Sequence, residues 1–241
     1  MSAGARQGDA RSEARFTPPR DECPEPWRWH SEDEGGAEDE VQGLLGQVVR
    51  ALKPRMSVET GAWRGRSAVA IASALRDNGG GRLWSIEMDP EAADAARRAL
   101  DGSDLGEWAE VVEGSSLAWR PPARIDLAFL DSAASIRGLE LIHLYRRMHR
   151  RTVLIVHDTG IHKRQPRRQL QILARLGLVA VVWCPTPRGL TFAQPRFPLG
   201  WRTRLAIGRS VIGRGVPVLH RAEDRAMRLR NSLRRRGISG G

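Results

Sequence analysis

The hydrophobic positions of the chain follow two periodicities between about residue 38 and residue 196. Apolar residues spaced by three and four predict a helix that begins near Val41 and ends before Pro54. Short apolar runs predict buried strands at 56–60, 82–88, 108–114, 125–132 and 152–158. Helical patterns separate most of these runs, at 66–77, 90–100, 139–145 and 170–173. Strands that alternate with helices predict an α/β domain, with a parallel sheet between two layers of helices.

Two further apolar runs, at 177–185 and 189–194, close this region of the chain. Only Thr186, Pro187 and Arg188 separate them. Three residues are too few for a crossover helix, so we expect an antiparallel hairpin. The hairpin raises the expected number of strands to seven, whereas a parallel dinucleotide-binding sheet has six.

Composition divides the chain into three parts. Residues 1–37 are polar and acidic, and we expect them to form a disordered arm. Residues 38–196 form the expected folded domain. Residues 197–241 form a basic, Arg-rich C-terminal extension, in which apolar residues at 219, 222, 226, 229 and 233 predict an amphipathic helix. Residues 186–241 hold thirteen arginines and two acids, so the net charge of +11 belongs mainly to this end of the chain.

The length and cysteine content limit the class of protein. None of the 241 residues belongs to an apolar run of about 18, so we expect no transmembrane helix. The first residues lack the apolar segment of a signal peptide. Cys23 and Cys184 are the two cysteines, and neither has the neighbours of a metal site. We therefore expect a reduced, cytoplasmic protein.

The segment ETGAWRGRS, residues 59–67, joins the first predicted strand to the helix after it. Gly61 and Gly65 would let backbone N–H groups and the helix N-terminus approach a polar ligand. Glu87 ends the next strand, where a carboxylate can accept hydrogen bonds from a ribose diol. The spacing differs from GxGxxG, and Glu59 would repel a pyrophosphate. The same acid would attract a ligand that carries an ammonium and a sulfonium.

Five motifs resemble those of the class I S-adenosylmethionine-dependent methyltransferases, and in particular the small-molecule O-methyltransferase-like members. In chain order they are ETGAWRGRS, LWSIEMDP, VVEGSS, IDLAFLDSAAS and VLIVHDTG. Five motifs in order, each at a strand end, are more specific than any one of them. The resemblance covers about residues 38–194. It implies a Rossmann-like three-layer sandwich whose seven-stranded, mostly parallel sheet has the order 3-2-1-4-5-7-6 and an antiparallel last strand.

The resemblance also implies a site for S-adenosylmethionine at the strand ends. The residues in matching positions are Glu59, Gly61, Ala62, Trp63, Gly65, Ser67, Glu87, Met88, Gly114, Ser115 and Asp131. Glu87 matches the acid that binds the ribose, and Gly114 and Ser115 match a segment that flanks the adenine. Ser115 stands where the family usually has an aspartate.

The candidate catalytic residues are Asp131, His157 and Asp158, at the ends of strands four and five. An unperturbed imidazole titrates near about 6.5, so His157 is a candidate base, although it could equally point into a helix layer. A related subgroup binds a divalent cation with acids at these positions, and oxygen ligands suit magnesium. That subgroup usually has asparagine where this chain has Thr159, and the strand-four motif loses its histidine to Ala134. These departures favour a site without metal over one with magnesium.

These observations predict O-methylation of a small-molecule hydroxyl on a sugar, lipid or secondary metabolite. The alternatives are a nucleic-acid methyltransferase, a non-catalytic relative, and a protein that uses its basic extension to bind nucleic acid or a membrane surface. Strand four lacks the D/N-P-P-Y/F ending of amino-directed nucleic-acid enzymes, which argues against nucleic acid as the acceptor. Peripheral membrane contact through the extension and assembly into homo-oligomers are compatible with the sequence.

Overall fold

A computed structural model of the chain describes residues 23, 25–33, 35–162 and 164–197. The first 22 residues of the expected arm lie outside the described residues, as does the extension from residue 198 with its expected amphipathic helix. The described helices are η1 (Pro26–Arg28), α1 (Asp39–Leu52), α2 (Arg66–Asn78), α3 (Pro90–Asp101), α4 (Arg137–Leu144), η2 (Tyr145–Arg147) and α5 (Arg164–Arg175). None of them combines the length and apolar character needed to cross a membrane.

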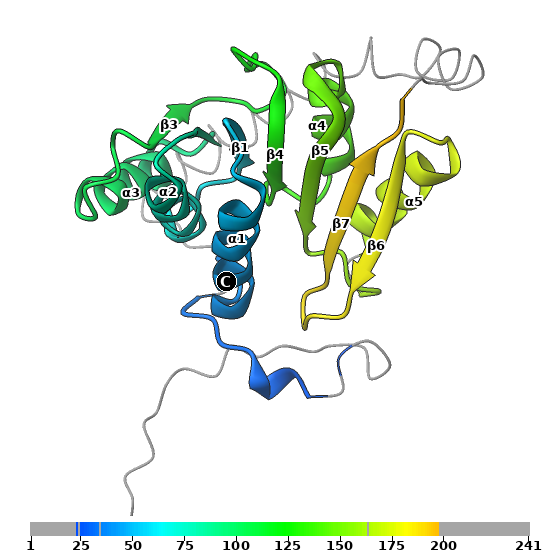
Figure 1. Cartoon of the computed structure of the whole chain (residues 1–241). Helices are drawn as coiled ribbons and strands as arrows, with labels where there is room; N and C mark the ends of the chain where they lie inside the picture. The colour runs from blue at the N-terminus through cyan, green and yellow to red at the C-terminus, as the bar shows by residue number, and fades with distance from the viewer. Residues whose placement is uncertain (1–22, 24, 34, 163, 198–241) are drawn as a thin grey trace, which may run out of the picture.

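A seven-stranded sheet runs through the domain (Figure 1). Its strands are β1 (Met56–Thr60), β2 (Arg82–Glu87), β3 (Ala109–Glu113), β4 (Ile125–Leu130), β5 (Met148–His157), β6 (Val179–Cys184) and β7 (Leu190–Pro195). The order is β3-β2-β1-β4-β5-β7-β6, and the first five strands in this order are parallel to one another. Strand β7 lies between β5 and β6 and is antiparallel to both. The predicted strand order and terminal hairpin are confirmed.

Alternate residues of the central strands pack on opposite layers of helices. In β4, Leu127 and Phe129 belong to the core cluster that contains residues of α1, α2 and α3. The intervening Ala128 and Leu130 belong to the cluster that contains residues of α4 and α5. Because helices cover both faces, the strands are apolar on both sides, and their sequence runs are continuous rather than alternating. The architecture is the predicted three-layer sandwich.

Strand β5 begins at Met148, four residues before its predicted start. The pattern of apolar residues does not reveal this part of the strand, because residues 149–151 are polar, and His149 binds Asp126 at 2.8 Å. The other end of β5 lies beside the end of β4, which pairs with β1 on its other side. From β1 the sheet continues through β2 and β3 in one direction, and from β4 it continues through β5 in the other. The helices that follow β1 and β4 lie on opposite faces of the sheet, and a crevice forms between two strands of this kind.

Candidate active site

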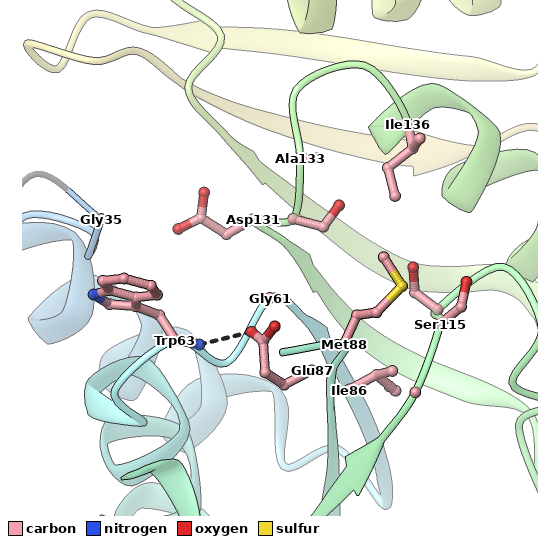
Figure 2. Close-up of a pocket in the computed structure, with 13 residues that line it drawn as sticks. Gly35, Gly61, Trp63, Ile86, Glu87, Met88, Ser115, Asp131, Ala133 and Ile136 are labelled. Carbon is pink, nitrogen blue, oxygen red and sulfur yellow. Dashed lines mark hydrogen bonds between the residues drawn. The ribbon is translucent and has the colours of Figure 1, made fainter. Parts of the chain in front are cut away.

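The loop between β1 and α2 forms part of a pocket at the carboxyl ends of β1, β2 and β4 (Figure 2). Gly61 has φ +84°, and a Cβ there would lie 2.6 Å from the carbonyl oxygen of Asp131. Gly65 has φ +80°, and its Cβ would lie 2.8 Å from the Cα of Ala96. Both positions require glycine, because other residues rarely adopt this conformation and neighbouring backbone leaves no room for a side chain.

Glu87, at the end of β2, presents an oriented carboxylate to this pocket. Its Oε2 accepts a hydrogen bond from the backbone N–H of Trp63 at 3.0 Å, as Figure 2 shows. Its Oε1 accepts one from the N–H of Asp89 at 2.9 Å. A carboxylate oxygen can accept more than one hydrogen bond, so Glu87 can bind a further donor such as a ribose hydroxyl.

Glu59, at the end of β1, is fully buried and does not line the pocket. Its Oε2 accepts from the Ser85 hydroxyl at 2.5 Å, whereas Oε1 has no hydrogen-bond partner among the described residues. Burial raises the pKa of Glu59 to about 7. A buried carboxylate with an unpartnered oxygen is costly, and a nearby positive ligand would offset that cost. The acid therefore fits a cationic cofactor.

The segment before α1 contacts the tryptophan of the loop, whose side chain stays partly exposed. The Nε1 atom of Trp63 lies 3.2 Å from each carboxylate oxygen of Asp33. Gly35 lines the pocket and lies so close to the indole that a Cβ would be 2.6 Å from the ring. The composition of residues 1–37 predicts disorder, but the described residues next to α1 contact the domain. Polar contacts of Asp33, the close approach of Gly35 to the indole and the burial of Ala37 in the core hold them there.

The two ends of the pocket differ in chemistry. In Figure 2, Met88, Ser115 and Ile136 lie together at one side, whereas the carboxylate of Asp131 points toward the side of Trp63. The first group offers apolar surface and a hydroxyl, which suit a nucleobase. The second side offers a carboxylate at the end of β4.

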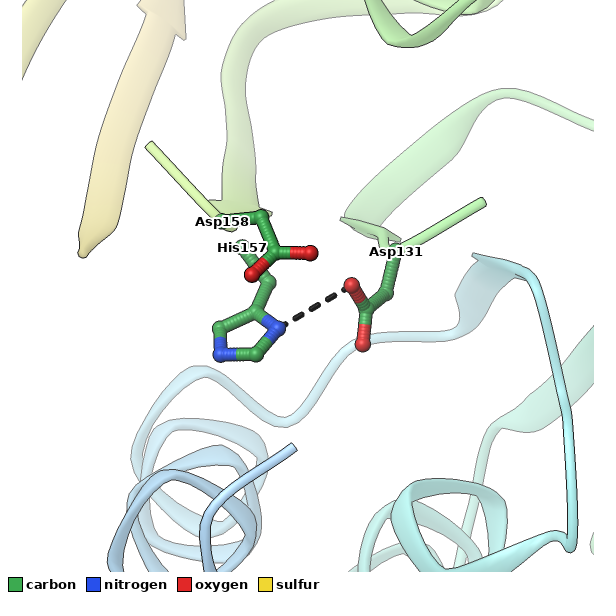
Figure 3. A group of neighbouring side chains, drawn as sticks. All are labelled: Asp131, His157 and Asp158. Atoms are coloured by element: carbon green, nitrogen blue, oxygen red, sulfur yellow. Dashed lines mark hydrogen bonds and ion pairs between the residues drawn. The ribbon is translucent and has the colours of Figure 1, made fainter. Parts of the chain in front are cut away.

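Asp131 and His157 form part of a buried ionic network at the ends of β4 and β5 (Figure 3). The imidazole Nδ1 lies 3.0 Å from Oδ1 of Asp131, and Nε2 lies 2.6 Å from Oε2 of Glu38. Burial alone would lower the pKa of His157, but Asp131 and Glu38 raise it to about 9. An imidazolium that donates from both nitrogens has no lone pair for an acceptor proton. The geometry therefore argues against the base role predicted for His157.

Two arginines that sequence reasoning missed neutralise the same acids. Nη2 of Arg137 lies 2.9 Å from Oδ1 of Asp131 and 3.2 Å from Oδ2 of Asp158. Arg188, in the link between β6 and β7, binds both oxygens of Asp158, with Nε–Oδ1 2.7 Å and Nη2–Oδ2 3.0 Å. Burial would raise the pKa of Asp158, but His157, Arg188 and Arg137 hold it below its usual range. Asp158 thus belongs to the network and does not line the pocket.

This network does not fit a divalent cation. His157, Arg137 and Arg188 supply three positive charges, and Asp131, Asp158 and Glu38 supply three negative ones. Burial would raise the pKa of Glu38, but His157 and Arg188 lower it, so Glu38 is the third anion. A buried dication would add two positive charges that no described side chain compensates.

Glu140, on α4, is a second buried acid behind the pocket. Its carboxylate accepts hydrogen bonds from Thr60 at 3.0 Å, from Ser132 at 2.7 Å and from the hydroxyl of Ser116. Burial raises the pKa of Glu140. Ser116 and Ser132 line the pocket, and because they donate to Glu140, their oxygens are left to accept hydrogen bonds from a ligand.

The structure brings most of the predicted cofactor residues into one pocket. Those that line it are Gly61, Trp63, Glu87, Met88, Gly114, Ser115 and Asp131. Four others do not line it: Glu59 and Ala62 are buried, Gly65 caps α2, and Ser67 lies in the first turn of that helix. Lining residues that sequence reasoning missed are Gly35, Ile86, Ser116, Ser132, Ala133 and Ile136. Ile86, Ser116 and Ser132 are next in sequence to predicted residues, and this adjacency was the one sign in the sequence that they would line the same pocket.

Part of the sequence is similar to known methyltransferases. Residues 58–159 match the model of a family described as a methyltransferase domain. Catechol O-methyltransferase B of Danio rerio is 34% identical over 100 residues, which cover 39% of this chain and 37% of that protein. Catechol O-methyltransferase of Sus scrofa is 32% identical over 95 residues, which cover 36% of this chain and 50% of that protein. The chain therefore spans half or less of the length of these relatives.

Solved structures share the fold over a longer stretch. An SAH-bound methyltransferase of Podospora anserina has a TM-score of 0.61 at 15% identity, covering 68% of this chain and 81% of that chain. An O-methyltransferase of Bacillus cereus in complex with SAH has a TM-score of 0.60 at 19% identity, covering 68% and 84%. The fold is that of class I methyltransferases. Together with the family match, it confirms the resemblance to class I O-methyltransferases that the five motifs predict.

Proposed function

We propose that the protein transfers a methyl group from S-adenosylmethionine to an oxygen of a small-molecule acceptor. The observation that carries this proposal is Glu87, whose carboxylate is oriented by the N–H groups of Trp63 and Asp89 at the pocket. Gly114 supports it, because this glycine lines the pocket and a Cβ there would meet nothing within 4 Å, which leaves space for a ligand beside it. A ribose on Glu87 would place a base toward Met88 and Ser115. The matched relatives are named O-methyltransferases, which supports oxygen as the acceptor atom.

The cofactor, when bound, would supply a methyl group made electrophilic by a sulfonium. Glu59 and Glu87 place negative charge near the pocket, which favours a cationic ligand. The remaining task of the site is to align an acceptor oxygen with the methyl group. Alignment can contribute roughly 7–11 kcal/mol to a displacement reaction.

We assign the contact with the acceptor to Asp131. Its Oδ1 accepts from Arg137 at 2.9 Å and from His157 at 3.0 Å. No hydrogen bond from a described side chain reaches its Oδ2. An acceptor hydroxyl can donate to Oδ2, which orients its lone pair and takes its proton as the new C–O bond forms. Arg137 and His157 keep the carboxylate in one orientation. They act on the acceptor only through Asp131.

Isothermal titration calorimetry with S-adenosylmethionine and its demethylated product tests the cofactor assignment. We expect both to bind the full chain. A panel of acceptors with single hydroxyls and with vicinal hydroxyls, assayed with and without a chelator, then tests the reaction. We expect methyl transfer that the chelator does not change. A folded protein that binds neither nucleoside contradicts the cofactor site, and methylation of nucleic acid alone contradicts the acceptor class.

We also propose a cytoplasmic location, with contact to anionic membrane surfaces through residues 197–241 and assembly into homo-oligomers as further expectations. Binding to vesicles with and without anionic lipid, compared for the full chain and a chain that ends at residue 196, tests the membrane contact. Light scattering tests the oligomeric state.

A further inference from the structure

The ends of β4 and β5 carry the atoms that a divalent cation would need. One ligand atom from each of Asp131, His157 and Asp158 lies within 4.8 Å of the others. Two carboxylates and an imidazole at this spacing are common metal ligands. Figure 3 shows the three side chains converging from the two neighbouring strands.

Guanidinium groups already engage three of the four carboxylate oxygens of these acids. Both oxygens of Asp158 accept from Arg188, and Oδ2 also accepts from Arg137. Oδ1 of Asp131 accepts from Arg137 and from His157. A cation that used these oxygens would have to displace hydrogen bonds from at least one arginine. Oδ2 of Asp131 is the oxygen that this arrangement leaves for a ligand.

Further hydrogen bonds to the backbone and to Glu38 hold both arginines in place. Arg137 donates its Nε–H to the carbonyl of Ser132 at 2.8 Å and an Nη1–H to the carbonyl of His157. Arg188 donates from Nη1 to the carbonyl of Gly36 and from its backbone N–H to Glu38 at 3.2 Å. Side chains held at several points lose little further entropy when they bind a carboxylate.

We propose that Arg137 and Arg188 take the place of a divalent cation between Asp131 and Asp158. Arg137 bridges the ends of β4 and β5, Arg188 binds both oxygens of Asp158, and together they balance the charge of the acids and exclude a metal ion. This inference deepens the proposed function, because it also restricts the acceptor. A bound cation needs oxygen ligands from its substrate and can take two adjacent oxygens of a vicinal diol, whereas one hydroxyl is enough to donate to Oδ2 of Asp131. The acceptor class is therefore a compound that reacts through a single hydroxyl and needs no second oxygen beside it.

The test of metal exclusion needs neither cofactor nor turnover. Manganese binding to the metal-stripped full chain is measured by electron paramagnetic resonance, for wild type and for Arg188→Ala. We expect no saturable site in wild type. In Arg188→Ala, both oxygens of Asp158 lose their main partner, so we expect manganese affinity to rise by at least about tenfold. Arg50→Ala, which removes an exposed arginine paired with Asp77, is the matched control and should behave as wild type.

Two results overturn the proposal. One is a saturable manganese site in wild type that Asp158→Asn abolishes. The other is a folded Arg188→Ala protein whose manganese affinity is unchanged. If Arg188→Ala does not unfold cooperatively, Arg188→Gln replaces it, because the amide keeps a hydrogen-bond donor without the charge. S-adenosylhomocysteine binding by the same samples reports separately on the proposed function.

The acceptor restriction is tested with a matched pair of probes, phenol and catechol. In the presence of a chelator, we expect methylation of phenol at a rate at least equal to that of catechol, and added magnesium should change neither rate. Turnover that requires both catechol and magnesium overturns the restriction. Absence of turnover with either probe, in a protein that methylates other single hydroxyls without metal, supports the metal-free site and excludes these two molecules.

Discussion

The imidazole of His157 lies against the carboxylate of Asp131, with 3.0 Å between Nδ1 and Oδ1. Its other nitrogen is bonded to Glu38, and the ring is fully buried. The histidine therefore serves as a fixed hydrogen-bond donor to Asp131, and the carboxylate is the group that faces the pocket. A motif that suggests an imidazole base thus folds into a site where a carboxylate, and not the imidazole, lines the pocket.

The raised pKa of His157 predicts how stability changes with pH. The folded protein holds the proton up to a pKa of about 9, compared with an ordinary value of 6.5. The stabilisation is complete below 6.5 and is lost as the pH rises toward about 9, by on the order of 3 kcal/mol. Urea unfolding of the wild-type chain across this range measures the loss.

His157→Gln is the control for this loss, because the amide retains hydrogen bonding without titrating. We expect a variant that is less stable near neutral pH and whose free energy of unfolding changes much less between pH 7 and about 9. Glu59 adds a separate loss between its ordinary 4.5 and about 7, so the comparison is made above that range. An equally steep fall in wild type and variant contradicts the assignment to His157.

Cofactor binding should release a proton from Glu59. The folded carboxyl has a pKa of about 7, so part of it is protonated near pH 6.5 before binding. A nearby sulfonium or ammonium would favour the charged form and lower that pKa. Calorimetry in buffers of different ionisation enthalpy should show proton release near pH 6.5 and little near about pH 8.5. Glu59→Gln should abolish the dependence on buffer, and proton uptake in place of release would contradict it.

Glu87→Ala should weaken binding of S-adenosylmethionine by about 1.5–3 kcal/mol, the typical effect of losing a hydrogen bond to a charged group. The Trp63 N–H would lose its partner too, so circular dichroism must first show that the variant folds. Glu113→Ala is the matched control, since this exposed acid ends the next strand and does not line the pocket. Equal affinities for the two variants would place the ribose elsewhere.

Gly61→Ala should weaken cofactor binding and reduce stability together. The positive φ alone costs about 1–2 kcal/mol for an alanine, and contact with the backbone of Asp131 adds to this. Thermal unfolding and calorimetry measure the two effects. At Gly43, in α1, a Cβ meets nothing within 4 Å, so Gly43→Ala should stabilise the helix slightly and leave cofactor affinity unchanged.

Asp131→Asn separates the contact with the acceptor from cofactor binding. The amide keeps the size of the side chain but is a poor proton acceptor, so we expect kcat to fall by about 10²–10⁴. Affinity for S-adenosylhomocysteine should change by only a few-fold. A variant with normal kcat would leave alignment alone to explain the reaction.

Patterns within short segments of the sequence predict the buried strands and the glycine turns of this structure. Leu127 and Phe129 lie in a continuous apolar run because β4 is covered on both faces, and Gly61 and Gly65 stand where the backbone needs positive φ. The partners of the buried acids are different, because Glu38 meets His157 across 119 positions. No periodicity encodes such a pair. A buried carboxylate must have a partner, but this requirement does not say which residue of the chain the partner is.

The hydrogen bond from the backbone of Arg188 to Glu38 joins residues 150 positions apart. During synthesis, β1 to β5 leave the ribosome before the link that carries Arg188, and until then Asp158 lacks its bidentate partner. Contacts of this span also slow folding, because a long loop must close before they form. The ionic network around Asp158 is therefore among the last parts of the domain to be completed. A nascent chain that stops before Arg188 carries β1 to β5 and every residue that lines the pocket, but not the arginine that binds both oxygens of Asp158.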